Sequence, residues 1–549
     1  MTRKDLANLM FPNVTETIYD LEKKYPKRKL DDSQIVTRYA PSPTGFIHMG
    51  NLLSAFIANK VAKDTNGIFY LRIEDTDNKR KVENGISKII DDLANFSIVP
   101  DEGVMSEDSQ KGEYGPYIQS ERQEIYNVYA KYMIENDLAY PCFCTETDLE
   151  NIRSNQEAKK ERIGYYSKYA TCRNMSVDEA YRRIENKEKY VIRLKSVGDF
   201  EKRVVVNDLV RGKVIFPEND IDHVLVKSDG IPVYHFAHVI DDHLMRTTHI
   251  LRGEEWLSSV PLHLQLFLML GFEVPKYAHL GLVMKIDENG VRRKLSKRKD
   301  KEAAISFYHE KGVPIEAVKL YLMTIANSNF EAFLDANPTA KIEDFKFDFK
   351  KVSASGTLFD LDKLINISRN YISRLTALEV YNYALKWALE FDKEFASLLE
   401  KYKDYSISIF NIERNQKKPR KDYDTFSSIK SHIWYMYDEY FTDLEYNWAK
   451  INDKKEISEI LDSYINNYYD VEDDKDTWFN KIKELASSFG YCPDMKEYKL
   501  NPDNYKGNVS DIATVIRVAV TTSTMSPDLY EILKLLGTDR IKNRFINIK

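Results

Sequence analysis

Apolar positions in the first 300 residues alternate between short β-branched runs and helical spacing. Residues 35–37 and 68–73 form two such runs, which predict strands. After each of them, apolar residues recur three and four positions apart, at 53, 56, 57 and 61 and then at 86, 89, 90 and 93, which predicts two helices. Strands and helices in this order are typical of a parallel sheet covered by helices.

The rhythm breaks from about residue 98 to residue 222. This stretch is rich in Tyr, Lys and Glu and contains short β-like runs at 190–194 and 203–206, so we predict an α+β insertion in the sheet domain. The sheet pattern then resumes, with strands predicted at 233–240, 248–252 and 280–286 and a helix at 260–270.

Beyond residue 300 strand signals nearly vanish and helical spacing continues to the end, for example at 358, 361, 364 and 365 and at 512, 515, 516 and 519. The chain is therefore expected to hold an α/β core with an insertion and a long helical region. The predicted divisions are an N-terminal extension 1–33, a first sheet half 34–110, the insertion 111–222, a second sheet half 223–300, and helical domains 301–375 and 376–549.

Composition restricts the classes of function. The 549 residues are 43% hydrophobic and 30% charged, with a net charge of −6, so any contact with a polyanion must come from local basic patches. The N-terminus has no apolar core of signal-peptide length, and no apolar run approaches a membrane span, so we expect a cytoplasmic location and no membrane partner. Four cysteines are too few for a disulfide framework.

Two loops carry candidate phosphate chemistry. The first runs from Arg38 through two prolines to His48 and Gly50, where the unpaired amide groups of a helix start would face an anion. The second is the basic run 292–299, in which Lys294 and Lys297 can meet the negative charge that develops on pyrophosphate when ATP is cleaved. Each loop alone has an ordinary alternative, a helix-capping histidine and a solvated charged face. Their order along the chain favours a shared ATP site.

These segments resemble the signatures of class I aminoacyl-tRNA synthetases in their bacterial glutamyl form. The first loop is similar to the HIGH motif, with Asn51 in place of its second histidine, and the Lys-Leu-Ser-Lys-Arg segment that begins at Lys294 is similar to the KMSKS loop. The segments 233–243 and 251–256 also resemble this family. The resemblance implies a Rossmann-like catalytic domain, an acceptor-stem-binding insertion, a helical stem-contact domain and an all-α anticodon-binding region.

The implied reaction is the ligation of L-glutamate to the 3′ end of tRNA(Glu), through a glutamyl-adenylate, with ATP and Mg²⁺. Some bacterial members of this family also charge tRNA(Gln) with glutamate, so tRNA(Gln) is a second expected partner, and the protein is expected to be a monomer. The resemblance gives a catalytic set of His48, Gly50, Lys294 and Lys297. To these it adds Glu255 and Trp256 for ATP, and for glutamate the residues Arg38, Ala40, Ser42, Glu74, Tyr234, His238 and Arg252.

Within this set the two arginines carry the amino-acid specificity. The family assigns the γ-carboxylate to the arginine that matches Arg252, and a guanidinium suits this role because it can grip a carboxylate with two parallel hydrogen bonds. Without the family, the better interpretation of Arg38 and Arg252 is as surface ion-pair partners, and their places at the ends of adjacent predicted strands turn the balance toward a pocket. His238 stands where some relatives have asparagine, and its alternative is a histidine satisfied inside a strand.

Three cysteines in the insertion form a candidate metal site. Cys142 and Cys144 are followed by Cys172, and tetrahedral zinc needs a fourth ligand. No histidine lies between His48 and His223, which leaves a nearby tyrosine. By resemblance to relatives that bind zinc through Cys-x-Cys, a tyrosine and a further cysteine, we predict structural Zn²⁺ on Cys142, Cys144, Tyr169 and Cys172. The alternative is three ordinary buried thiols.

Four other functions are weighed against the glutamyl type. A glutaminyl-tRNA synthetase would share the core, but the Ala-Pro-Ser-Pro-Thr-Gly form of the first loop favours glutamate. A short relative that glutamylates a modified tRNA base lacks the helical C-terminal region, and small-molecule nucleotidylyltransferases with an HxGH loop are usually far shorter. A silent paralogue that only binds RNA would not need to keep the candidate catalytic residues.

Overall fold

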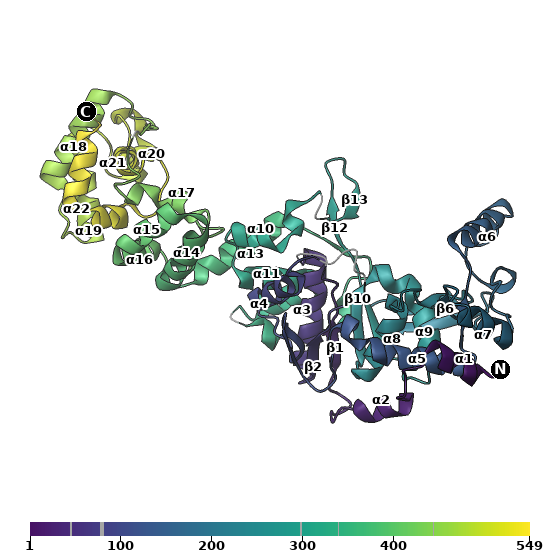
Figure 1. Ribbon diagram of the computed structural model, residues 1–549. Coiled ribbons are helices and arrows are strands. Elements are labelled where there is room, and N and C mark those ends of the chain that lie inside the picture. Colours follow the sequence, from purple (N-terminus) through teal and green to yellow (C-terminus); the bar gives the residue numbers. More distant parts are fainter. Residues whose placement is uncertain (44–46, 77–81, 297–298, 339, 443, 549) are drawn as a thin grey trace. The chain divides into compact units, whose positions relative to one another are not determined.

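The computed structural model describes residues 1–43, 47–76, 82–296, 299–338, 340–442 and 444–548. The chain divides into two compact units (Figure 1). Unit 1 contains residues Met1–Phe307 and Lys319–Asp360, and unit 2 contains Tyr308–Val318 and Leu361–Lys549. All candidate catalytic and metal-binding residues that the structure describes belong to unit 1.

Unit 1 is built on the predicted parallel sheet. Strands β1 (Val36–Tyr39), β2 (Ile68–Leu71) and β3 (Glu102–Ser106) pair in parallel, and β4 (Ser109–Lys111) adds an antiparallel edge. On the other side of β1 lies a second parallel pair, β10 (His249–Gly253) and β11 (Lys276–Leu280). The amide of Thr248 donates to the carbonyl of Val36 at 3.1 Å, which joins β10 to β1. In space the strands therefore follow the order β3-β2-β1-β10-β11. The order in which the chain visits the strands changes direction between β1 and β10, and in open parallel sheets ligands bind at such a point, beyond the carboxyl ends of the strands.

Helices connect these strands as predicted. The segment α3 (Met49–Asp64) links β1 to β2, α4 (Gly85–Asn95) links β2 to β3, and α9 (Val260–Met269) links β10 to β11. Figure 1 shows α3 packed along β1 and β2. The apolar face of α4, including Ile86, Ile89 and Leu93, is buried, in agreement with its spacing.

One predicted strand is wrong. Residues 233–240 belong to the helix α8 (Tyr234–Leu244) instead of a strand. Their sequence is apolar enough for either structure, and periodicity alone cannot assign such a short run. In the helix, Tyr234, His238 and Asp242 are spaced by four residues and share one face. The difference decides which side chains reach the sheet. A smaller difference is that the predicted strand 280–286 is divided between β11 and β12.

The insertion is an α+β region, as predicted. It contains an antiparallel sheet of β5 (Ala139–Cys142), β6 (Val191–Leu194) and β9 (Val224–Val226), and a hairpin of β7 (Arg203–Asp208) and β8 (Gly212–Pro217). Its helices are α5 (Gln123–Glu135), α6 (Glu146–Ala158) and α7 (Val177–Glu185). Strand β7 of the hairpin packs against β11. This part of the insertion therefore contacts the catalytic sheet directly.

The N-terminal extension forms two short helices that fasten onto the rest of unit 1. Both α1 (Arg3–Met10) and α2 (Ile18–Lys24) begin with a Thr-x-x-Asp capping box. Arg28 then forms a two-pronged ion pair with Glu102 on β3, at 2.8 and 2.9 Å, and Glu22 pairs with Arg246 after α8. The extension therefore stabilises the core of unit 1.

The second predicted loop lies on a small sheet. Strand β12 (Val283–Ile286) pairs with β13 (Arg292–Lys294) and with β14 (Thr357–Leu358), so Leu358 is in a strand and not in the predicted helical segment. The rest of the chain is helical, with α10 (Ile305–Glu310), α11 (Ile315–Ala326), α12 (Phe330–Ala336), α13 (Leu361–Arg374), α14 (Ala377–Phe391), α15 (Lys393–Lys401), α16 (Lys403–Asn411), α17 (Ile429–Ile433), α18 (Lys454–Ser463), α19 (Lys475–Ser488), α20 (Met495–Leu500), α21 (Val509–Thr521) and α22 (Leu529–Ile546).

Unit 2 has its own core, in which Val380, Ile460, Ile512 and Ile532 are fully buried. The α21 residues at 512, 515, 516 and 519 all belong to this core, as their spacing predicts. Of the helices in the described part of the chain, none has both the length and the apolar character needed to cross a membrane.

Candidate active site

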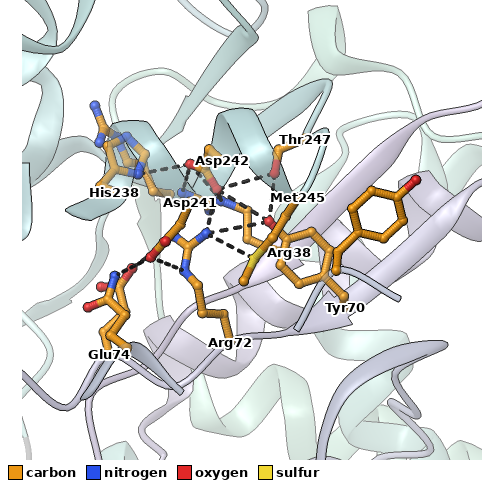
Figure 2. A network of polar contacts seen from close by, with 12 residues as sticks. Arg38, Tyr70, Arg72, Glu74, His238, Asp241, Asp242, Met245 and Thr247 are labelled. Carbon is orange, nitrogen blue, oxygen red and sulfur yellow. Dashed lines mark hydrogen bonds and ion pairs between the residues drawn. The ribbon is translucent and has the colours of Figure 1, made fainter. Parts of the chain in front are cut away.

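The centre of the site is a buried carboxylate, Asp242 on α8 (Figure 2). Its side chain accepts hydrogen bonds from Arg38 Nε at 3.1 Å and from Arg72 Nη1 at 2.7 Å. The two guanidiniums outweigh the cost of burial and hold the pKa of Asp242 well below its usual range. Arg38, predicted to bind glutamate, is thus already held by an anion of the protein, and it extends from β1 toward the carboxyl end of β10.

Glu74 follows β2 and lies at the same edge of the sheet. Burial raises the pKa of its carboxyl group, and the Arg72 guanidinium, which donates from Nη2 to Oε1 at 3.0 Å, opposes this rise. The loop from Ala40 to Ser42 lies beside it, because the amide of Glu74 donates to the carbonyl of Pro41 at 2.9 Å. These predicted glutamate-binding residues therefore meet where β1 and β2 end.

Arg252 at the end of β10 differs from Arg38 in its partners. It is only 6% exposed, yet none of the residues that the structure describes forms an ion pair with its guanidinium. Its Nε donates to His279 Nε2 at 3.0 Å, and the longer contacts of its two Nη groups, at 3.3 to 3.4 Å, go to His263, Tyr234 and the carbonyl of Trp256. A buried charge without a counter-ion is costly, so this arginine is suited to an anionic ligand.

Aromatic rings from α8 lie near Arg252. Tyr234 stacks on His238, with ring centroids 5.4 Å apart, and the centroid of the Trp256 ring lies 4.3 Å from that of Tyr234. Burial lowers the pKa of His238 to about 3, although the nearby Asp242 opposes this shift, so the ring is neutral at pH 7. Its Nδ1 lies 2.8 Å from Asp242, and its buried Nε2 has no hydrogen-bond partner in the described part of the chain.

The two candidate phosphate loops line one cleft. Its walls include His48, Gly50, Glu255 and Lys294, which come from α3, from the end of β10 and from β13. His48 caps α3, because its Nδ1 accepts from the amides of Gly50 and Asn51 at 3.1 and 3.2 Å. A neutral ring in this role carries its proton on Nε2, which makes that nitrogen a donor. The capping alternative and the phosphate-binding role are therefore compatible.

Of the predicted ATP set, one residue is outside the described part of the chain and one does not line the cleft. Lys297 falls outside the described residues, and the side chain of Trp256 packs on Tyr234 while the cleft is lined by its neighbour Glu255. Gly50 is explained by His48: a Cβ added at this position would come within 3.2 Å of the histidine ring. A larger residue would therefore press on the cap as well as on any nucleotide.

The three thiols of the insertion converge. The sulfur atoms of Cys142, Cys144 and Cys172 lie within 4.8 Å of one another, and those of Cys144 and Cys172 are 3.6 Å apart. Tyr169, the predicted fourth ligand, instead donates its hydroxyl to Glu161 at 2.6 Å. The hydroxyl that joins the thiols belongs to Tyr165, at 3.2 Å from Cys144 and 3.4 Å from Cys142.

The predicted set missed three residues that hold the site: Asp242, His263 and His279. Asp242 is four residues from His238 on the same helix, so a correct helix for 234–244 could have found Asp242. His263 has no such neighbour on α9. His279 has no local signal, because only its strand pairing with Arg252 places it.

Comparisons with known proteins agree with this site. A family model described as the catalytic domain of class I tRNA synthetases (E and Q) matches residues 34–365, and a model of an anticodon binding domain matches residues 503–548. The first spans the sheet, the insertion and both phosphate loops. The second lies in the helical unit 2.

Relatives and solved structures cover nearly the whole chain. A glutamate--tRNA ligase of Acetivibrio thermocellus is 47% identical over 545 residues, and one of Clostridium beijerinckii is 47% identical over 551 residues, with 99% of each chain covered in both cases. A crystal structure of a glutamate tRNA ligase from Elizabethkingia meningosepticum, in complex with its amino acid, superposes with a TM-score of 0.75 and 25% identity, covering 94% of this chain and 99% of that one.

Proposed function

Because the chain belongs to the class I tRNA synthetases of the glutamate and glutamine group, we propose that it ligates L-glutamate to tRNA(Glu) in an ATP-dependent reaction. The relatives named above are glutamate--tRNA ligases, and the match extends over catalytic and helical regions alike. The geometry of the site bears most directly on which amino acid is bound.

The observation that carries the proposal is the charge of Arg252, with which none of the described residues forms an ion pair. A glutamate γ-carboxylate would supply the missing anion and accept from both Nη groups, whereas the amide of glutamine would turn an NH₂ group toward donors and leave them unpaired. Arg38 cannot fill this role alone, because Asp242 already neutralises it. Arg38 would instead orient the substrate, with Glu74 and the unpaired Nε2 of His238 nearby.

The proposed mechanism depends on position and charge. The α-carboxylate of glutamate attacks the α-phosphate of ATP, and pyrophosphate leaves toward the cleft between His48 and Lys294. His48 donates from Nε2 and Lys294 adds positive charge where negative charge develops, with Lys297 expected to act in the same way. Mg²⁺ supplies further charge neutralisation when bound with ATP. The terminal hydroxyl of the tRNA then attacks the carbonyl carbon of the glutamyl-adenylate, the bond from that carbon to the phosphate oxygen breaks, and AMP leaves.

We also propose a structural Zn²⁺ ion on Cys142, Cys144, Cys172 and Tyr165. Zinc–sulfur bonds of about 2.3 Å in a tetrahedron put two sulfurs roughly 3.8 Å apart, and the 3.6 Å between Cys144 and Cys172 fits this geometry. The Tyr165 hydroxyl supplies the fourth donor. The ion would hold the ends of β5 and of the loop after Tyr165 together.

Further partners follow from the same proposal. Unit 2 would bind the anticodon, since an anticodon-domain model matches its end, and both tRNA(Glu) and tRNA(Gln) are candidate substrates for a monomeric enzyme. Three adjacent thiols fit a reducing compartment, the cytoplasm.

Replacing Arg252 with alanine tests the proposal. We expect kcat/KM for glutamate to fall at least about 100-fold in aminoacylation of tRNA(Glu), because two charge-assisted hydrogen bonds are lost. ATP binding, measured by calorimetry, should change less than about 3-fold, since Arg252 does not line the cleft. Arg162→Ala, which breaks an ion pair with Asp220 in the insertion, is the matched control. Equal losses for glutamate and ATP would contradict the assignment.

A further inference from the structure

The guanidinium of Arg252 rests on uncharged partners. Its two nearest imidazoles are His279, which accepts from Nε at 3.0 Å, and His263, whose Nδ1 lies 3.3 Å from both Nη groups. Burial lowers the pKa of both histidines, so the rings are neutral. The positive charge of Arg252 is therefore held in place without being cancelled, unlike that of Arg38 on Asp242.

His279 is placed there by the sheet. In the parallel pairing of β10 with β11, Arg252 stands directly opposite His279, and the ring is fully buried. Arginine has no acceptor atom, so the nitrogen that receives its Nε–H, Nε2, must lack a proton. The proton of the ring is consequently on Nδ1.

The Nδ1 proton is held by Asp208 at the end of β7. Its Oδ2 accepts from His279 Nδ1 at 2.7 Å and from the backbone amide of His279 at 3.0 Å. Its Oδ1 accepts from the amides of Val210 and Arg211, both at 2.9 Å. Four donors thus fix the orientation of the carboxylate, which is 3% exposed.

We propose that Asp208 and His279 are positioning residues for glutamate selection, because they fix the His279 tautomer that holds Arg252 with its charge available to the substrate. The inference rests on the proposed function, in which Arg252 binds the γ-carboxylate. A carboxylate in place of His279 would cancel the charge of Arg252. The other tautomer of His279 would carry its proton on Nε2 and point that N–H at the Nε–H of Arg252, so no hydrogen bond could form. Asp208 acts from the insertion, so that region would contribute to the choice of amino acid.

Asp208→Asn is the decisive variant. The oxygen of the new side-chain amide can keep accepting hydrogen bonds from the backbone amides of Val210 and Arg211, which turns its NH₂ group toward Nδ1 of His279. Because an NH₂ group can only donate, Nδ1 must then lack a proton, and the ring proton moves to Nε2. We expect KM for glutamate to rise roughly 10–100-fold with kcat and the KM for ATP within about 3-fold, and the preference for glutamate over glutamine to fall by a similar factor.

Two variants of His279 keep the test independent of folding. His279→Gln can offer its carbonyl oxygen to Arg252 and should retain most of the glutamate affinity. His279→Leu has no acceptor, so its KM for glutamate should rise as much as that of Asp208→Asn. Asp220→Asn, in the same insertion and also paired with an arginine, is the matched control and should leave KM unchanged.

Arg252→Ala is measured in parallel. Loss of glutamate activation in Arg252→Ala together with normal kinetics in Asp208→Asn and His279→Leu would overturn this inference alone. Normal activity of Arg252→Ala would overturn the proposed function and the inference with it. Equal rises in KM for glutamate and ATP, without rescue by His279→Gln, would reduce the pair to a structural role and overturn the inference.

Discussion

Asp242→Asn should destabilise unit 1 more than any surface substitution. The buried network around Asp242 contains three arginines (Arg38, Arg72 and Arg122) and three carboxylates (Glu74, Asp241 and Asp242), so its charges cancel. The change to asparagine removes one negative charge and leaves a net charge of +1 in a network of which all members except Glu74 are buried.

The magnitude follows from the contacts. Asp242 is the ion-pair partner of both Arg38 and Arg72, and Arg72 is fully buried. Removal of one member of a buried ion pair costs about 3–5 kcal/mol. An asparagine keeps one acceptor oxygen, so we expect a loss near the lower value, about 3 kcal/mol, in the free energy of unfolding.

The assay must separate the two units. Of the five tryptophans, only Trp256 lies in unit 1, so total fluorescence reports mainly on unit 2. Hydrogen–deuterium exchange resolved by peptide avoids this problem, and exchange in β1 and β2 should accelerate by roughly 10² at a loss of 3 kcal/mol. Asp91→Asn on the exposed side of α4 is the control and should stay within about 0.5 kcal/mol. A loss below about 1 kcal/mol for Asp242→Asn would refute the reasoning.

Two further predictions concern metal and pH. Purified protein should contain about one zinc per chain, Cys172→Ser should lower that content and the thermal stability, and a zinc content near zero without chelators would contradict the site. Burial lowers the pKa of His249 to about 4 from an unfolded value of about 6.5. Above pH 6.5 the histidine is neutral in both states and the folded protein has its full stability. As the pH falls from 6.5 toward 4 the unfolded state takes up a proton first, so the free energy of unfolding decreases. At pH 5 this loss is about 2 kcal/mol, which His249→Gln should remove from the pH dependence of urea unfolding; an unchanged slope would count against it.

The sequence alone determined the fold class and the family. Apolar spacing identified β1, β2, α3, α4 and the helical C-terminal region, since strand and helix periods are local properties of the chain. The motifs from Arg38 to Gly50 and at Lys294 predicted the synthetase family, and the family match confirms it. Both loops indeed line one cleft.

Tertiary structure decided the rest. Residues 233–240 could form either a helix or a strand, and as a helix they place Asp242 against Arg38. Only the convergence of the insertion loops brought the hydroxyl of Tyr165 to the thiols, and only the pairing of β10 with β11 put His279 beside Arg252. The two arginines look alike in sequence. They differ in their surroundings because their partners depend on residues far apart in the chain: Asp242 cancels the charge of Arg38, whereas no described residue forms an ion pair with Arg252.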